Sequence, residues 1–129
     1  MLASLIAGHF VILVLGVFYR FVDGDEGGYL VVSKEVINGR IPILDINAHN
    51  QPLLYYFYGA WMKLFGFNIV AARSLSAAAV FAAGLLLIYW VYKFSKNYRT
   101  VVIAYLIFIT NLTFYKVNIS VKPFPLSNL

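Results

Sequence analysis

Two long apolar segments constrain the fold of this chain more than any other feature. The first covers residues 2–19, in which His9 is the only ionisable side chain, and the second covers residues 67–92. Eighteen helical residues rise about 27 Å, close to the thickness of the hydrocarbon core of a bilayer. The chain is 62% hydrophobic and only 12% charged, whereas ordinary soluble domains carry about 25% charged residues. We therefore predict an all-α integral membrane protein.

A cleaved signal peptide is the alternative interpretation of residues 2–19. Such a peptide begins with a basic segment and ends at a small-residue cleavage site. The chain begins "MLAS" and the segment ends "GVFYRF", so it has neither feature. We favour a retained membrane helix.

Residues 100–115 form a shorter apolar segment, which we predict to be a third span.

The charged residues are divided between the two ends of these spans. The segment 93–99 contains three basic residues and no acidic one. Because short cytoplasmic loops are rich in Lys and Arg, we place it in the cytoplasm, with the N-terminus. Residues 20–66 and the tail 116–129 then lie on the outer face of a plasma or inner membrane. This outer loop contains all five carboxylates of the chain, Asp23, Asp25, Glu26, Glu35 and Asp45.

The net charge of +5 also raises the possibility of nucleic-acid binding. The basic residues are scattered among apolar segments, whereas a nucleic-acid site gathers them on one polar surface. Membrane topology explains the charge better, so we predict no nucleic-acid partner and a single membrane domain.

The outer loop contains two segments with the pattern of short helices. Residues 27–38 alternate apolar and polar positions at helical spacing, and Gly39 is a natural stop. Residues 53–65 are rich in Tyr and Trp, as the headgroup zone favours, and they end at Gly66. We predict that both are amphipathic helices lying on the membrane surface.

Three interpretations fit the acidic cluster "DGDE" at residues 23–26. Asp23 or Asp25 can cap the following helix, and Asp23 with Glu26 resembles a capping box. A carboxylate beside an apolar face is partly desolvated and can instead act as a general base. A divalent cation is the third possibility, because Mg²⁺ and Ca²⁺ prefer carboxylate oxygens, but no full ligand set is visible.

Further polar residues of the loop are candidates for binding. His49, Asn50 and Gln51 stand together before an aromatic segment and can bind a hydroxylated or phosphorylated group, or form a solvated loop. Asp45 is either a turn former or a second carboxylate of the site. Arg73, at the start of the second span, can extend to the interface or contact a lipid phosphate.

The order of these motifs resembles the N-terminal part of GT-C-type membrane glycosyltransferases. The nearest families are the protein O-mannosyltransferases and the lipid A aminoarabinose transferases. The resemblance runs continuously over about 60 residues, roughly 20 to 80, and rests on the order and spacing of the pieces rather than on any one of them. The matching positions are Asp25, Glu26, Tyr29, Gly39, Asp45, 52–56, 64–66 and 71–73.

The resemblance implies an inverting transfer from a polyprenyl-phosphate sugar to a protein or glycolipid acceptor on the outer face. It gives Asp25 the role of catalytic base, with Glu26 assisting or orienting it. It makes Arg73 the expected contact for the lipid phosphate. The donor is a lipid-linked sugar, and a divalent metal is not expected. The substrate-binding residues that we predict are Tyr29, Asp45, His49, Asn50, Gln51 and Arg73.

Two features depart from that pattern. Many relatives read Lys-Pro-Pro-Leu where this chain reads Asn50-Gln51-Pro52-Leu53. A phosphate-binding lysine is therefore missing. Relatives also have many more spans, so we expect a truncated chain that is inactive alone. The alternative function is a small non-catalytic membrane subunit or transport-associated protein.

Overall fold

The computed structural model describes residues 1–22, 24–46 and 51–110, and it forms helices without any strand in these ranges. The predicted all-α fold is thus confirmed for this part of the chain. The five helices are α1 (Leu2–Tyr19), α2 (Gly24–Ile37), α3 (Pro52–Phe65), α4 (Ile69–Ser95) and α5 (Tyr98–Thr110).

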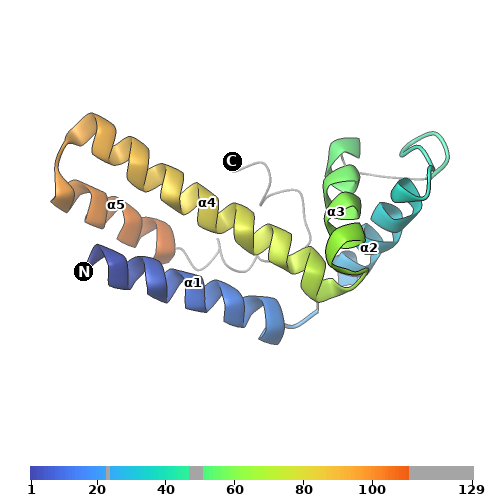
Figure 1. The fold of residues 1–129 in the computed structure, drawn as a ribbon, viewed down its shortest axis with the longest axis horizontal. Coiled ribbons are helices and arrows are strands. Elements are labelled where there is room, and N and C mark those ends of the chain that lie inside the picture. The colour runs from blue at the N-terminus through green and yellow to red at the C-terminus, as the bar shows by residue number, and fades with distance from the viewer. Residues whose placement is uncertain (23, 47–50, 111–129) are drawn as a thin grey trace.

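The helices α1, α4 and α5 lie side by side, and α4 runs antiparallel to the other two (Figure 1). Two of them, α1 with 18 residues and α4 with 27, are long and apolar enough to cross a membrane. The shorter helix α5 covers the first part of the predicted third span. The rest of that span, residues 111–115, and the predicted tail 116–129 lie outside the described residues.

Local signals in the sequence explain where α3 and α4 begin and end. Pro52 occupies the first turn of α3, where its missing N–H costs no helical hydrogen bond. The side chain of Asn68 caps α4 by accepting a hydrogen bond from the amide of Ala71 at 2.8 Å. The two helices end at Gly66 and Lys96, which have positive φ angles of 102° and 50°.

The loop predicted at residues 93–99 is shorter in the structure. The helix α4 continues through Ser95 and α5 begins at Tyr98, so only Lys96 and Asn97 separate the two helices. Lys93 and Lys96 lie at the end of α4, where basic side chains interact favourably with the helix dipole, and Arg99 lies in the first turn of α5.

The helices α1, α4 and α5 are held together by apolar contacts and by a buried polar contact. Leu13 and Val17 of α1 pack against Val80 of α4. His9 Nδ1 lies 2.7 Å from the hydroxyl of Tyr105, which joins α1 to α5. A side chain at Gly84 would approach the ring of Tyr105 to 3.1 Å, so this glycine allows the three helices to meet closely.

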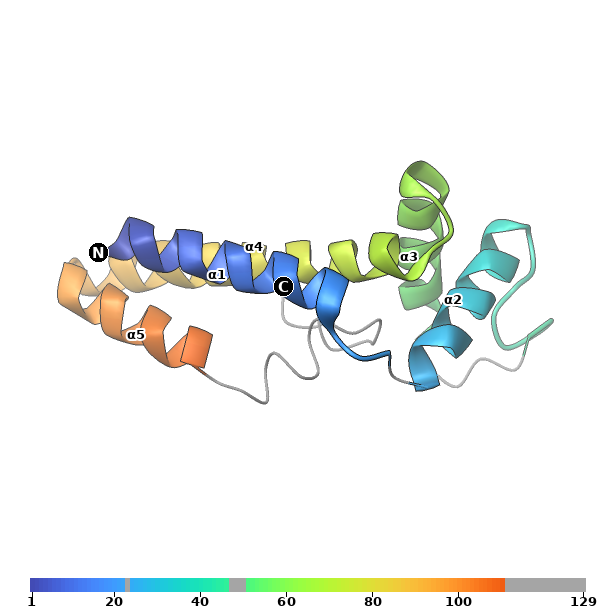
Figure 2. The ribbon, with the colours of Figure 1, turned by 90° about the horizontal axis from the view of Figure 1, so that it is seen from below.

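The helices α2 and α3 form a second layer at the end of the long helices where α4 begins (Figure 2). Their predicted bounds, 27–38 and 53–65, differ from the observed ones by a few residues. A side chain at Gly59 of α3 would collide with Ile37 and lie 2.7 Å from the carbonyl oxygen of Ser33, so α3 approaches α2 closely here. The core of this layer consists of Val36, Leu54, Tyr55, Tyr58, Met62, Ala71 and Ala72.

Cysteine labelling tests the predicted membrane topology, because the chain has no native cysteine. The prediction puts the exposed residue Asn38 outside and the exposed residue Asn97 in the cytoplasm. In intact cells, a membrane-impermeant maleimide should label Asn38→Cys at once and Asn97→Cys only after the membrane is permeabilised. Labelling of Asn97→Cys in sealed cells would show that the topology is wrong.

Candidate functional site

A buried ion pair joins the second layer to the long helices. Arg73 Nη2 donates to Glu26 Oε2 at 2.6 Å, and Arg73 Nε donates to Glu26 Oε1 at 3.1 Å. These two parallel bonds match the planar guanidinium to the planar carboxylate. The Arg73 side chain is 2% exposed and that of Glu26 is fully buried.

The same guanidinium also binds the chain just after α1. Arg73 Nη1 donates to the carbonyl oxygen of Arg20 at 2.9 Å, and Nη2 donates to that of Phe21 at 3.1 Å. The Arg20 side chain approaches the pair from outside, with Nη1 3.7 Å from Glu26 Oε1. One arginine therefore connects the C-terminal end of α1, the first turn of α2 and the start of α4.

This arrangement bears on the two roles predicted for Arg73 and Glu26. The guanidinium of Arg73 makes four hydrogen bonds within the chain and its side chain is 2% exposed, so it has little surface left to contact a lipid phosphate. A fully buried carboxylate is also poorly placed to touch a substrate directly. The geometry favours the orienting role of Glu26 over the assisting one, and it gives Arg73 a positioning role that the sequence reasoning missed.

Asp25 has a different environment from its neighbour. It lies in the first turn of α2, where a negative charge interacts favourably with the helix dipole, and its side chain is exposed. Adjacent carboxylates thus differ sharply: that of Glu26 is held inside the protein and that of Asp25 is presented at the surface. Asp23, the predicted capping residue, lies outside the described residues.

Aromatic residues of α2 and α3 connect this region to the start of α4. Tyr29, one turn after Asp25, stacks on Tyr55 with ring centroids 6.2 Å apart, so the rings tie α2 to α3. The buried hydroxyl of Tyr58 lies 2.7 Å from Ser76 Oγ, and Trp61 Nε1 donates to Ser74 Oγ at 3.0 Å. These contacts fix α3 against the start of α4.

The remaining predicted residues do not join this cluster in the described structure. Asp45 is exposed and closes a turn, in which Oδ2 accepts from the amide of Ile41 at 2.8 Å, as the turn-forming interpretation expected. Gln51 is exposed just before α3 and makes no side-chain capping bond there. His49 and Asn50 lie outside the described residues.

An apolar groove of about 390 Å³ runs between α1 and α4. Small side chains of α4 form much of one wall, and larger apolar side chains of α1 form the other. Its residues are Phe10, Leu13, Val14, Val17, Phe18, Val70, Ser74, Ala77, Ala78, Phe81, Ala82 and Leu85. The groove can receive a hydrocarbon chain or another apolar helix, but it offers almost no polar group to either.

Metal binding finds no support among the residues that the structure describes, since no three His, Asp or Glu side chains there come close enough to hold an ion.

Comparison of the chain with protein-family models, with curated proteins and with solved structures finds no match.

The ion pair can be tested through stability. Arg73→Met leaves the buried Glu26 carboxylate without its main partner and should lower the free energy of unfolding by about 3–5 kcal/mol. Replacing both residues, Glu26→Leu with Arg73→Met, should recover part of this loss because neither charge of the pair remains, although Arg20 Nη1 loses its contact with Glu26. Denaturant unfolding in detergent micelles, followed by circular dichroism, measures both values.

The exposed pair of Glu35 and Arg40 is the matched control. Arg40 Nε lies 3.2 Å from Glu35 Oε2, but the side chains are 61% and 35% exposed. Arg40→Met should therefore cost less than about 1 kcal/mol. A loss no larger than this in Arg73→Met would mean that the buried pair does not hold the layers together.

Proposed function

We propose that the chain is the N-terminal membrane part of a glycosyltransferase of the GT-C type. In this proposal the full-length enzyme transfers a sugar from a polyprenyl-phosphate donor to an acceptor on the outer face of the membrane, and the chain alone is inactive. The observation that carries the proposal is the contrast between exposed Asp25 and buried Glu26 in the first turn of α2. Pairs of carboxylates whose environments differ in this way are typical of sites that assign them separate roles.

The proposed topology puts this turn at the outer membrane surface. Charge supports it, because all five Asp and Glu residues lie within residues 23–45, and the charged residues of the segment 93–99 are all basic. The helix lengths support α1 and α4 as spans. A third span that includes α5 would return the chain to the outer side.

In the proposed reaction, Asp25 accepts the proton of an acceptor hydroxyl or amine. The acceptor oxygen or nitrogen then attacks the anomeric carbon of the sugar. The bond between this carbon and the phosphate oxygen breaks, and the polyprenyl phosphate leaves with the bonding electron pair. The ion pair of Glu26 and Arg73 positions the turn that carries Asp25. Groups that stabilise the leaving phosphate would come from further membrane segments, because Arg73 is already engaged within the chain.

Asp25→Asn tests this assignment. The amide is nearly the same size but cannot accept the proton, so transfer should fall by at least about 100-fold, the lower end of what general bases contribute. The measurement is transfer of labelled sugar from a polyprenyl-phosphate donor in membranes of cells that express the full native reading frame. Glu35→Gln, on the same helix, is the matched control and should keep full activity.

Unchanged transfer in Asp25→Asn would remove this residue as the base. Absence of transfer in the wild type with every polyprenyl-phosphate sugar tested would count against the enzyme altogether.

A non-catalytic membrane subunit is the second candidate, and the groove between α1 and α4 favours it. Small residues on a helix face allow another helix to approach closely in a membrane. Ser74, Ala78 and Ala82 follow one another at four-residue spacing along this groove. In this alternative, a helix of a larger partner occupies the groove.

Filling the groove distinguishes the two candidates. Ala78 is exposed in the groove, and Ala78→Phe should displace a partner helix and shift the chain to a smaller complex in native electrophoresis of solubilised membranes. Leu86→Phe is the control, since Leu86 is an exposed residue of α4 that does not line the groove. A wild-type chain that migrates at its own mass, or an unchanged complex in Ala78→Phe, would contradict the subunit hypothesis.

A further inference from the structure

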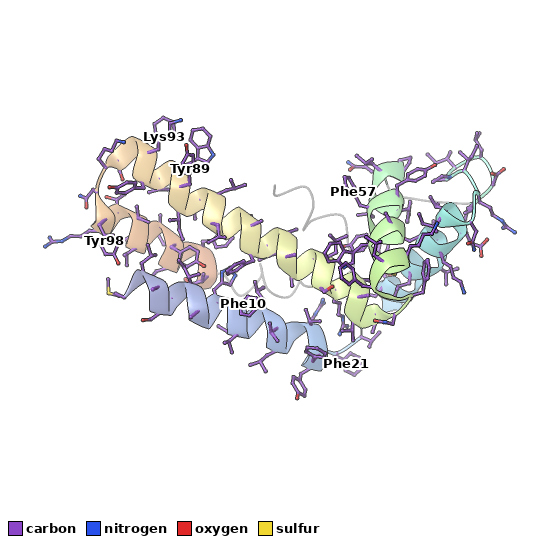
Figure 3. The ribbon with its side chains drawn as sticks, viewed as in Figure 1. Phe10, Phe21, Phe57, Tyr89, Lys93 and Tyr98 are labelled. Atoms are coloured by element: carbon purple, nitrogen blue, oxygen red, sulfur yellow. The ribbon has the colours of Figure 1, made fainter. Side chains whose placement is uncertain are left out.

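The end of the long helices farthest from α2 and α3 carries a cluster of basic side chains. We call Lys93, Lys96 and Arg99 the basic turn, because they lie where α4 ends and α5 begins. Figure 3 shows Lys93 at this end, together with Tyr89 and Tyr98. The sequence has no Asp or Glu after residue 45, so the basic turn has no acidic side chain near it along the chain.

The basic residues at the other end are different, because several are neutralised within the protein. Arg73 and Arg20 lie next to Glu26, and Arg40 lies 3.2 Å from Glu35. By contrast, no residue of the basic turn forms an ion pair with any part of the chain that the structure describes. Its three positive charges are exposed and not neutralised by these residues, so they are available to a negative partner from outside them.

Aromatic rings lie beside the ammonium groups of the two lysines. Lys93 Nζ lies 4.5 Å from the ring centroid of Trp90 and 5.8 Å from that of Tyr89. Lys96 Nζ lies 5.9 Å from the ring of Tyr92. All three rings are exposed, and Trp and Tyr favour the headgroup level of a bilayer. The ammonium groups are thus kept beside rings that mark this level.

The backbone of the basic turn is also well defined. Asn97 Oδ1 accepts from the amide of Arg99 at 2.9 Å, and Ser95 Oγ accepts from the amide of Asn97 at 3.2 Å. The hydroxyl of Tyr98 accepts from the amide of Leu2 at 3.1 Å, which ties the basic turn to the start of α1. These bonds already restrict the backbone of the basic turn, so a bound ligand would cause a smaller loss of conformational entropy there.

We propose that the basic turn binds the phosphate groups of anionic membrane lipids. The argument is charge complementarity: three unneutralised cations lie at the headgroup level of a helix that can cross the bilayer. Basic segments next to membrane spans attract anionic lipids, by about fivefold in affinity for each basic residue. The surface is separate from Asp25, so this inference does not depend on the proposed enzymatic function.

Tryptophan quenching by brominated lipids tests the proposal locally. The chain has two tryptophans, so the background variant Trp61→Phe leaves Trp90 as the only reporter. This protein is reconstituted into vesicles of phosphatidylcholine and phosphatidylglycerol, with bromine on one or the other lipid. Phosphatidylglycerol should be preferred next to Trp90 by at least about fivefold, the contribution of one basic residue, and high salt should reduce this preference.

Two charge-neutralised variants make the test specific. Lys93→Gln, Lys96→Gln and Arg99→Gln combined should abolish the preference, whereas Lys34→Gln, Arg40→Gln and Lys63→Gln combined, at the other end, should leave it unchanged. Equal quenching by both lipids in the protein with the native basic turn would overturn the proposal. A preference for phosphatidylglycerol that persists in the variant with the neutralised basic turn would also overturn it. Loss of the preference on adding excess inorganic phosphate at constant ionic strength would also overturn it, because the ligand would then be a free anion.

Discussion

The buried guanidinium of Arg73 is the interaction on which the arrangement of the layers depends. Apolar packing and the buried contact between His9 and Tyr105 bring α1, α4 and α5 together. A further interaction fixes the position of α2 relative to these helices. Its first turn follows α1 by only a few residues, so this interaction acts close to the end of α1. Arg73 fixes that turn by binding Glu26 and the two carbonyl groups after α1.

Burying charge in this way opposes folding unless the partners satisfy each other. Removing a guanidinium and a carboxylate from water costs several kcal/mol for each ion. The fork of Arg73 compensates for this cost through four hydrogen bonds, two of them to an opposite charge. These hydrogen bonds are directional, so they are all satisfied in one arrangement of the helices. Apolar contacts by themselves do not specify that arrangement.

The sequence predicted the long helices well and the polar contacts poorly. Hydrophobic runs and the stop at Gly66 identify α1, α3 and α4, because local physics determines those features. The pair of Glu26 and Arg73 is separated by 47 residues, and no local pattern connects them. Each residue had a sensible local interpretation, as a capping residue or as an interfacial cation, and only the tertiary fold shows that they satisfy each other. Asp45 had two interpretations for the same reason, and the turn at Ile41 favours one of them.

The use of backbone carbonyls by Arg73 has a consequence for how such a chain tolerates sequence change. A carbonyl oxygen accepts the same hydrogen bond whatever side chain its residue carries. Position 21 can therefore accept many side chains without disturbing the guanidinium. Positions 26 and 73 cannot vary separately, because a change at one leaves a buried charge at the other. In related chains these two positions should therefore covary, while their neighbour Phe21 drifts.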